Sequence, residues 1–446
     1  TRQQMLETCG VRFCSDLRGV NEAIPHERMT QLPQFNVMCP LLAAKKLCLF
    51  DIRSGYFSVL LDEEAQQIFG FQVDHEYYVY TRLVQGFKNS VAIFQNLMYQ
   101  VFNERAWDEY RKGIDCLKYL TFQDTFSIYV DDLVVAAYDL QQLFHCTEFA
   151  LMCIKRAGLK FHPKKICIDK TFAEVLGFEL NTKNSTYKIA TKRAAAILQW
   201  TFPANRNAIK SRVASLQYFA QCLPGIKHII FGLILLAKSK HNKLTFKKLH
   251  KLEFMAMRLL VAMEIEMHLP QLDQPLYVSS DASFSTYAGV VMQRRPILDK
   301  NNKPTGENTM VVCAAMSKNF KQGDLQRAIY QKETQAMVQT LKSFEYWIRA
   351  AIKTVFSTDC IFLAHIANLR HQDSKMFATA LFLSTFGTVF FVHSRGSQFL
   401  VALSDILSRG LGGSEILSAA GIPKEYLEDR KQLGDPTGMI ISPKTQ

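Results

Sequence analysis

Two adjacent aspartates, Asp131 and Asp132, interrupt the apolar run FSIYVDDLVVAA at residues 126–137, and no other segment limits the possible folds as much. Residues that strands prefer lie on both sides, so the pattern predicts two antiparallel strands and a tight turn with both carboxylates at its tip. Neighbouring negative charges beside apolar surface are unfavourable unless a cation neutralises them. A solvent-exposed Asp-Asp turn is a common alternative, so the pair alone does not indicate a site.

A third carboxylate favours a site over a simple turn. Asp51 ends the apolar run Leu47–Phe50, within the segment LCLFDIRSGYFSVLL (47–61) that predicts strand, turn and strand. If this strand end meets the Asp131–Asp132 hairpin in one sheet, the carboxylates can hold a pair of Mg²⁺ ions. Nucleotidyl transfer needs that arrangement, because one ion activates the attacking oxygen and the other neutralises the leaving group.

Length and charge bound the rest of the interpretation. A chain of 446 residues is too long for one ordinary core, so two or three domains are expected. The formal net charge of +13 favours nucleic acid as a partner, although a basic protein without such a partner is an equally fair reading of charge alone. Eleven cysteines without a C-x-x-C pair indicate a reducing intracellular setting: the cytoplasm, a particle or the nucleus, not secretion. No stretch predicts a membrane span.

The periodicity divides the chain into successive segments. Residues 1–190 alternate strand-like and helical runs, and 191–270 are almost wholly helical and basic. Strands return with helices between them over 271–412, which predicts a second, α/β domain. The tail, 413–446, shows no clear periodicity and is left unassigned.

One helix of the basic segment has a clear apolar face, formed by Ile209, Val213, Leu216 and Phe219. Its charged side could lie along a nucleic acid backbone, or it could simply be solvated. The pattern fits both readings.

A second set of acids follows the strands of the later domain. Asp281 ends the run 276–280, Asp359 follows 354–356, and Asp405 precedes a short apolar run where it could cap a helix. Glu333 falls on the apolar stripe of a helix, where an ionised group needs a cation or strong donors. Each acid alone is more commonly a cap or a surface residue, but together they predict a two-Mg²⁺ site for phosphodiester hydrolysis.

The chain resembles the reverse transcriptases of retroviruses and gypsy-type LTR retrotransposons. The resemblance rests on five segments in the family's order and rough spacing: VRFCSDLRGVNEAIP, LFDIRSGYFSVLL, RLVQGFKNSVAIFQNLM, YVDDLVVAA and VLGFEL. It implies an α+β and α/β multidomain fold: a right-hand polymerase with N-terminally short fingers, a palm and a thumb, followed by a ribonuclease H-like domain.

The same resemblance assigns roles to residues of the first domain. Asp51, Asp131 and Asp132 would be the catalytic triad and ligands of Mg²⁺, with Mn²⁺ as a substitute. The residues at positions that contact the incoming nucleotide or the primer are Arg12, Tyr56, Gln85, Tyr129, Leu176 and Gly177. Arg12 would contact the triphosphate and Tyr56 would exclude a ribose 2′-hydroxyl, while Leu176 and Gly177 would belong to a primer-gripping hairpin.

In the second domain, SSDAS, QKETQAM, STDC and ALSDILSR resemble gypsy-type ribonuclease H sequences. The order Asp281, Glu333, Asp359 and Asp405 resembles the acidic pattern of that family, so all four would be catalytic and bind metal. His393 could be a mobile histidine of the site or a surface residue.

The implied function is extension of a DNA primer with dNTPs on an RNA or DNA template, with cleavage of RNA in the resulting RNA–DNA hybrid. The chain would be a piece of a larger polyprotein, without a membrane partner and with self-association left open. Val84 and Val91 stand where the family has proline, so we expect a looser loop around Gln85. Two alternatives remain: a retroelement copy that binds nucleic acid without catalysis, and a second domain that only connects.

Overall fold

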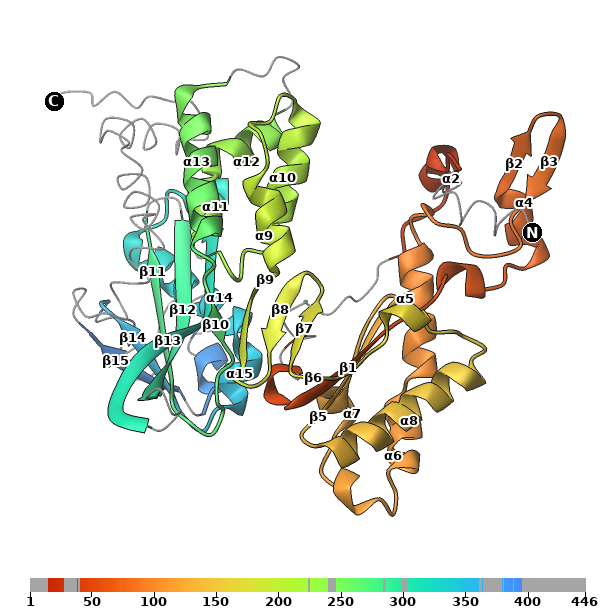
Figure 1. Cartoon of the computed structure of the whole chain (residues 1–446). Coiled ribbons are helices and arrows are strands. Elements are labelled where there is room, and N and C mark those ends of the chain that lie inside the picture. The colour runs from red at the N-terminus through yellow and green to blue at the C-terminus, as the bar shows by residue number, and fades with distance from the viewer. Residues whose placement is uncertain are drawn as a thin grey trace. The chain divides into compact units, whose positions relative to one another are not determined.

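The computed structural model describes residues 15–27, 38, 41–223, 225–239, 246–283, 286–298, 304–360, 363, 379, 381–387 and 389–394. The chain divides into two compact units. The first comprises Thr1–Leu176 and Leu180–Ser185, and the second comprises Gly177–Glu179 and Thr186–Gln446. Figure 1 labels the elements of both units.

A four-stranded sheet of order β4-β5-β1-β6 is the centre of the first unit. Its strands are β1 (Lys46–Asp51), β4 (Phe126–Tyr129), β5 (Asp132–Ala137) and β6 (Cys167–Lys170). The expected hairpin at 126–137 is confirmed, since β4 and β5 pair antiparallel from Phe126↔Val135 to Tyr129↔Asp132. β1 pairs antiparallel with both β5 and β6.

Helices pack on this sheet, because their apolar side chains and those of the strands are buried together in one core. α8 (Leu140–Arg156) begins at Asp139, whose carboxylate accepts a hydrogen bond from the Gln142 amide, and its basic last turn suits the negative end of the helix dipole. α5 (Ser90–Val101) buries Phe94 and Met98 in the same core. Trp107 is fully buried in the shared core. The remaining helical elements around this core are α6 (Glu104–Tyr110), η2 (Asp115–Leu117), α7 (Phe122–Thr125) and η3 (Pro163–Lys165).

The expected second strand after Asp51 is not formed. The chain instead makes a turn and a 3-10 segment, η1 (Tyr56–Ser58), and Leu60 forms only an isolated bridge with Arg82. Ser54 has a left-handed φ of 54°, and the Tyr56 ring then packs edge-on against Phe94 at 5.6 Å. Tertiary packing therefore overrides the alternating pattern.

A smaller core lies towards the N-terminal side of this unit. Leu83, Val84 and Phe87 are buried there with Leu17 and Phe69. The surrounding elements are α2 (Arg18–Ala23), α4 (Glu63–Ile68), β2 (Gly70–Val73) and β3 (Glu76–Val79).

Another sheet has the order β10-β9-β8-β7. Its strands are β7 (Phe172–Val175), β8 (Phe178–Asn181), β9 (Thr186–Ile189) and β10 (Met267–His268). In the second unit, the hydroxyl of Tyr187 on β9 donates to the backbone oxygen of Cys313, at 3.3 Å. Tyr187 is almost fully buried, so this bond ties β9 to the later strands.

Helices make up most of the described part of residues 191–262, as the sequence predicts. They are α9 (Thr191–Leu198), α10 (Arg206–Tyr218), α11 (Ile226–Ile229), α12 (Phe231–Lys238) and α13 (Lys248–Ala262). The predicted apolar face of α10 and its C-cap, Ile209, Val213, Leu216 and Phe219, is buried. The buried carboxylate of Glu253 accepts hydrogen bonds from the Gly232 and Leu233 amides and so satisfies the start of α12.

The later part of the second unit is a five-stranded sheet of order β13-β12-β11-β14-β15. The strands predicted there are confirmed: β11 (Leu276–Ala282), β12 (Thr286–Leu298), β13 (Pro304–Asn319), β14 (Thr354–Thr358) and β15 (Val389–His393). Between β13 and β14 come η4 (Gln322–Asp324), α14 (Ile329–Ser343) and α15 (Glu345–Ala350). Gly289 on β12 lets α14 approach closely, because a Cβ there would lie 2.1 Å from Thr340 Oγ1.

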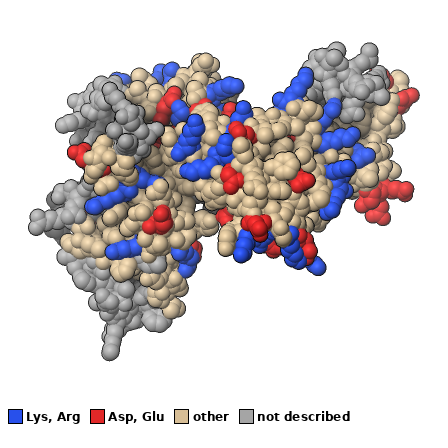
Figure 2. Space-filling model, turned by 60° about the horizontal axis from the view of Figure 1, so that its bottom comes forward, with Lys and Arg blue, Asp and Glu red and all other residues tan. Residues whose placement is uncertain are grey.

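The sequence has 53 Lys and Arg against 40 Asp and Glu, which gives the net charge of +13. Figure 2 shows groups of Lys and Arg interspersed with acidic side chains on the face it draws. None of the helices in the described ranges is both long and apolar enough to cross a lipid bilayer.

Candidate active sites

The structure brings Asp51 together with the aspartate hairpin. Asp51 and Asp132 are directly opposed across β1 and β5. The Ile52 amide donates to the Asp131 backbone oxygen at 2.8 Å, and the His162 amide donates to the Asp51 backbone oxygen at 2.8 Å. Backbone bonds on both sides therefore hold three carboxylates at one end of the sheet.

The turn between β4 and β5 has an uncommon backbone. Val130 has a φ of 54°, which is costly for a β-branched residue unless its surroundings impose it. Gln95, buried on α5, supplies that restraint: its Oε1 accepts from the Val130 amide at 2.6 Å. Its Nε2 donates to the Ile128 backbone oxygen at 3.4 Å. One side chain thus holds both the end of β4 and the left-handed turn residue that follows it.

Gly55 makes room for the central carboxylate. A Cβ at this position would lie 2.3 Å from Asp131 Oδ1 and 2.7 Å from the Phe94 ring. Its own φ of −49° is ordinary, so space rather than conformation requires glycine here. Asp131 Oδ1 is buried and has no hydrogen-bond partner among the described residues.

Charge and burial make this end of the sheet attractive to cations. Burial, then the charges of Asp51 and Asp132, raise the pKa of Asp131 from 3.8 to about 6. Burial followed by Asp51 also raises the pKa of Asp132. Both shifts reflect burial first and the nearby negative charges second.

Lys165 provides the compensation that the structure does contain. Its Nζ lies 2.7 Å from Asp51 Oδ2, and its charge opposes the rise in the pKa of Asp131. The lysine side chain is 57% exposed, so solvent screens the pair and the ammonium can leave at small cost.

The other residues predicted for this site lie at different depths. Tyr56 is near it, because burial and then Asp131 raise the pKa of its phenol. Tyr129 is half-buried opposite Asp132, and Gln85 is exposed in a turn. Arg12 lies outside the described residues.

The loop that carries Gln85 is well supported despite its two valines. Val84 is buried, and its backbone oxygen accepts from Ser90 Oγ at 2.7 Å. Asn21 donates to the Gly86 backbone oxygen at 2.9 Å. Val91, on the first turn of α5, is exposed. These hydrogen bonds restrain the loop on both sides of Gln85, at positions where the family has proline to do so.

Leu176 and Gly177 form the two-residue turn between β7 and β8. Both have positive φ, 52° and 81°, as a tight hairpin turn of this kind requires. A Cβ on Gly177 would lie 3.3 Å from the Phe219 ring, and its backbone oxygen accepts from the Ala190 amide.

Three acids of the second set occupy neighbouring elements. The parallel register of β11 and β14 runs from Leu276↔Thr354 to Ser279↔Ser357, and two residues further along it Asp281 and Asp359 follow. Glu333 on α14 accepts from the Ala282 amide at 3.2 Å. Asp281 and Glu333 are buried and Asp359 is exposed. His393 Nε2 lies 3.2 Å from the Asp359 backbone oxygen, and Asp405 lies outside the described residues.

The donors of both sets suit a hard divalent ion. Carboxylate oxygens are the ligands Mg²⁺ prefers, and the buried Asp131 Oδ1 without a partner is what such a cation would satisfy. Over the described residues, however, no three His, Cys, Asp or Glu side chains already form a ligating group. Lys165 on Asp51 is one contact that would have to yield.

The family described as reverse transcriptase (RNA-dependent DNA polymerase) matches residues 9–180, and the RNase H-like domain found in reverse transcriptase matches residues 271–386. The chain belongs to the reverse transcriptases. Its relatives are retroviral and gypsy-type Pol polyproteins, and its fold is a polymerase followed by a ribonuclease H-like domain.

The chain is 24% identical to the Gag-Pol polyprotein of avian reticuloendotheliosis virus, over 65% of this chain and 25% of that one. It is 24% identical to the enzymatic polyprotein of cauliflower mosaic virus (strain NY8153), over 82% and 50%. The Drosophila melanogaster Pol polyprotein from transposon gypsy is also 24% identical, over 82% and 33%. This reverse transcriptase chain thus spans a quarter to a half of these curated relatives.

Solved structures support the fold. The foamy viral protease-reverse transcriptase in complex with double-stranded DNA is similar with a TM-score of 0.63 at 18% identity, covering 87% of this chain and 75% of that one. The same viral protein in complex with an RNA/DNA hybrid gives 0.62, covering 86% and 49%.

Sequence reasoning missed three residues that shape the first site: Gly55, Gln95 and Lys165. Gln95 left a signal, because it lies among the apolar positions of its helix and is a polar residue on the buried side. Gly55 and Lys165 left none, since their roles depend on chain segments that meet only in the fold.

Proposed function

We propose that this chain extends the 3′ end of a DNA primer with deoxynucleotides on an RNA or DNA template. The observation that carries the proposal is the direct pairing of Asp51 with Asp132, beside an Asp131 carboxylate whose pKa is raised to about 6. Carboxylates this close together raise the free energy of the folded protein unless a cation neutralises them. Their arrangement therefore supports a role in binding cations.

Asp51, Asp131 and Asp132 would hold the divalent ions, which supply charge neutralisation for nucleotidyl transfer when bound. The protein's own contribution is to keep these carboxylates in place before substrate arrives. Gln95 fixes the turn, Gly55 leaves room for Asp131, and the Tyr56 ring, packed edge-on against Phe94, would contact the incoming sugar.

We further propose that the second domain hydrolyses the RNA strand of an RNA–DNA hybrid. Asp281 and Asp359 at adjacent parallel strand ends, with Glu333 beside them, support this role, and Asp405 would complete the set. A fold that only connects would not need buried acids at Asp281 and Glu333. We propose that the whole chain works as part of a longer polyprotein, since it spans only part of its relatives.

Primer extension with Mg²⁺ tests the polymerase proposal. Asp131→Asn should abolish extension while the chain still binds primer–template. Asp74→Asn is the matched control, because Asp74 also lies in a hairpin turn, the one between β2 and β3, but this hairpin is not part of the sheet that carries the three acids. If the unaltered chain binds primer–template and does not extend it, the nucleic-acid-binding alternative replaces the proposal.

Cleavage of a labelled RNA strand in an RNA–DNA hybrid tests the second domain. Glu333→Gln should remove cleavage, whereas Glu307→Gln, at an exposed position of β13, should leave it unchanged. Absence of cleavage by the unaltered chain would leave the connecting role.

A further inference from the structure

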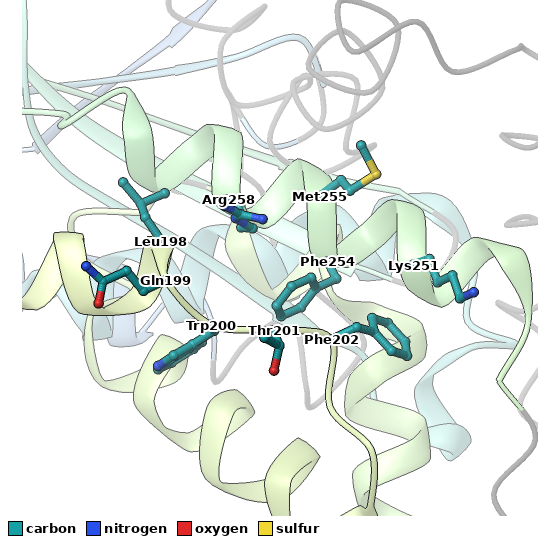
Figure 3. A pocket seen from close by; sticks show the side chains of 9 residues that line it. All are labelled: Leu198, Gln199, Trp200, Thr201, Phe202, Lys251, Phe254, Met255 and Arg258. Atoms are coloured by element: carbon teal, nitrogen blue, oxygen red, sulfur yellow. The ribbon is translucent and has the colours of Figure 1, made fainter.

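A groove lies on the helical part of the second unit, outside both acid sites. It has a volume of about 550 Å³ and lies between α13 and the segment that joins α9 to α10. Figure 3 shows the rings of Trp200, Phe254 and Phe202 following one another across the groove, with Lys251 beyond Phe202. We call it the aromatic groove.

The rings of the aromatic groove are held in place by their neighbours. Phe202 and Phe254 meet edge to face, with centroids 5.6 Å apart. The Arg212 guanidinium lies 5.6 Å from the Trp200 ring and 5.7 Å from the Phe254 ring, and it donates to the Thr201 backbone oxygen. Burial lowers the pKa of Arg212, in keeping with its position against the rings. The rings therefore form a preorganised surface, with Trp200 half-buried at its edge.

Positive charge surrounds these rings. Lys251 and Arg258 lie seven residues apart on α13, about 10 Å along the helix axis, and both are exposed. None of the described residues that line the groove is acidic. Neither cation forms an ion pair within the described part of the chain.

We propose that the aromatic groove binds single-stranded nucleic acid, with a base stacked on Trp200 and backbone phosphates near Lys251 and Arg258. Every base has a face that stacks on an aromatic ring, and a basic rim attracts the backbone without sequence preference. The groove takes an unpaired strand because bases inside a duplex have no free face to offer. This binding site is separate from the proposed catalysis, and RNA and DNA strands share the chemistry it recognises.

Tryptophan fluorescence provides a local readout. The chain has three tryptophans; Trp107 and Trp347 are buried, 0% and 2% exposed, so Trp200 is the one that a base can reach. Oligodeoxythymidine and oligouridine, each twelve nucleotides long, are added stepwise to the full chain. An abasic oligonucleotide of equal charge and a duplex of equal length are added in parallel titrations. The two single strands should quench the emission, and the abasic strand and the duplex should not.

Variants separate stacking from charge. Trp200→Ala should weaken the groove's binding of single strands about 5- to 10-fold, measured by anisotropy of a labelled strand, and Trp200→Phe should retain most of it. The logarithm of the association constant for a single strand falls as the logarithm of the salt concentration rises. Lys251→Gln and Arg258→Gln should each make this negative slope shallower by about 0.7. Tyr119→Ala is the matched control: this residue is 86% exposed and has Lys118 Nζ 5.5 Å from its ring, but it is not one of the residues that line the aromatic groove.

Unchanged Trp200 emission at saturating single strand would overturn the proposal, as would equal quenching by the abasic strand. Equal quenching by the duplex would assign the groove to duplex binding instead. An acidic peptide that quenches where the strands do not would identify a protein partner. Asp131→Asn separates the two proposals, since it should remove extension and leave the quenching intact.

Discussion

The two acid sites of this chain gather carboxylates in different ways. In the first, an antiparallel hairpin places Asp131 and Asp132 together and a neighbouring strand adds Asp51, at the cost of a left-handed Val130 and a glycine at 55. In the second, parallel strands β11 and β14 bring Asp281 and Asp359 to one edge with ordinary backbone. The hairpin therefore depends on supporting residues such as Gln95, whereas the parallel edge depends mainly on the sheet.

The largest expected effect tests whether the two sites are independent. Asp51→Asn should lower primer extension by about 10³-fold or more and leave hybrid cleavage unchanged, and Asp281→Asn should do the reverse. Extension and cleavage are measured on the same preparations with Mg²⁺. Loss of both activities from either single change would contradict two separate sites.

Crowding the hairpin should disable the first site alone. Gly55→Ala places a methyl group against Asp131 Oδ1 and the Phe94 ring, and the resulting displacement of about 1 Å should cost about 10²-fold in kcat for extension. Gly19→Ala is the control, because a Cβ at residue 19 meets nothing within 4 Å. If Gly55→Ala extends primers at the normal rate, then extension does not depend on the position of Asp131 seen in this structure.

Removing the restraint that Gln95 provides should have a smaller effect. Gln95→Leu deprives the Val130 amide of its acceptor, so kcat should fall about 10-fold and the free energy of unfolding by about 1–3 kcal/mol. Gln100→Leu, on the exposed side of the same helix, should change neither quantity. An equal loss in both variants would indicate a general effect on α5, not on the turn.

The smallest effect concerns charge. The native protein binds a proton at Asp131 between about pH 4 and 6 that the unfolded chain does not bind, so this group's contribution to the free energy of unfolding falls as pH rises through that window. Asp131→Asn should therefore stabilise the first unit by about 1–2 kcal/mol above pH 6, allowing for partial exposure, and by nothing below pH 4.

Urea unfolding read by Trp107 measures this effect, in a background with Trp200→Phe and Trp347→Phe. Mg²⁺ should shrink the difference between the two proteins, because a bound cation relieves the same repulsion. Stabilisation that is equal at pH 4 and pH 7 would have a cause other than the charge of Asp131.

The sequence predicted those parts of the first site that short patterns encode. Asp51 ends an apolar run and Asp131–Asp132 interrupts another, so strand ends and a hairpin follow from local chemistry. The strand expected after Asp51 was wrong because the fold turns Tyr56 against Phe94. Lys165 was out of reach because it meets Asp51 across 114 positions of sequence. In the second site the acids were predicted, but their common edge depends on the register of β11 with β14.

The bond from Tyr187 to the Cys313 backbone affects how this chain can be dissected. β9 rests on a strand that comes more than a hundred residues later, and Gly177 belongs to the same compact unit. A fragment that ends before β13 would leave the buried phenol of Tyr187 without its acceptor. Expression of the two parts of this chain as separate pieces should therefore begin from cuts that keep β9, β10 and β13 on one polypeptide.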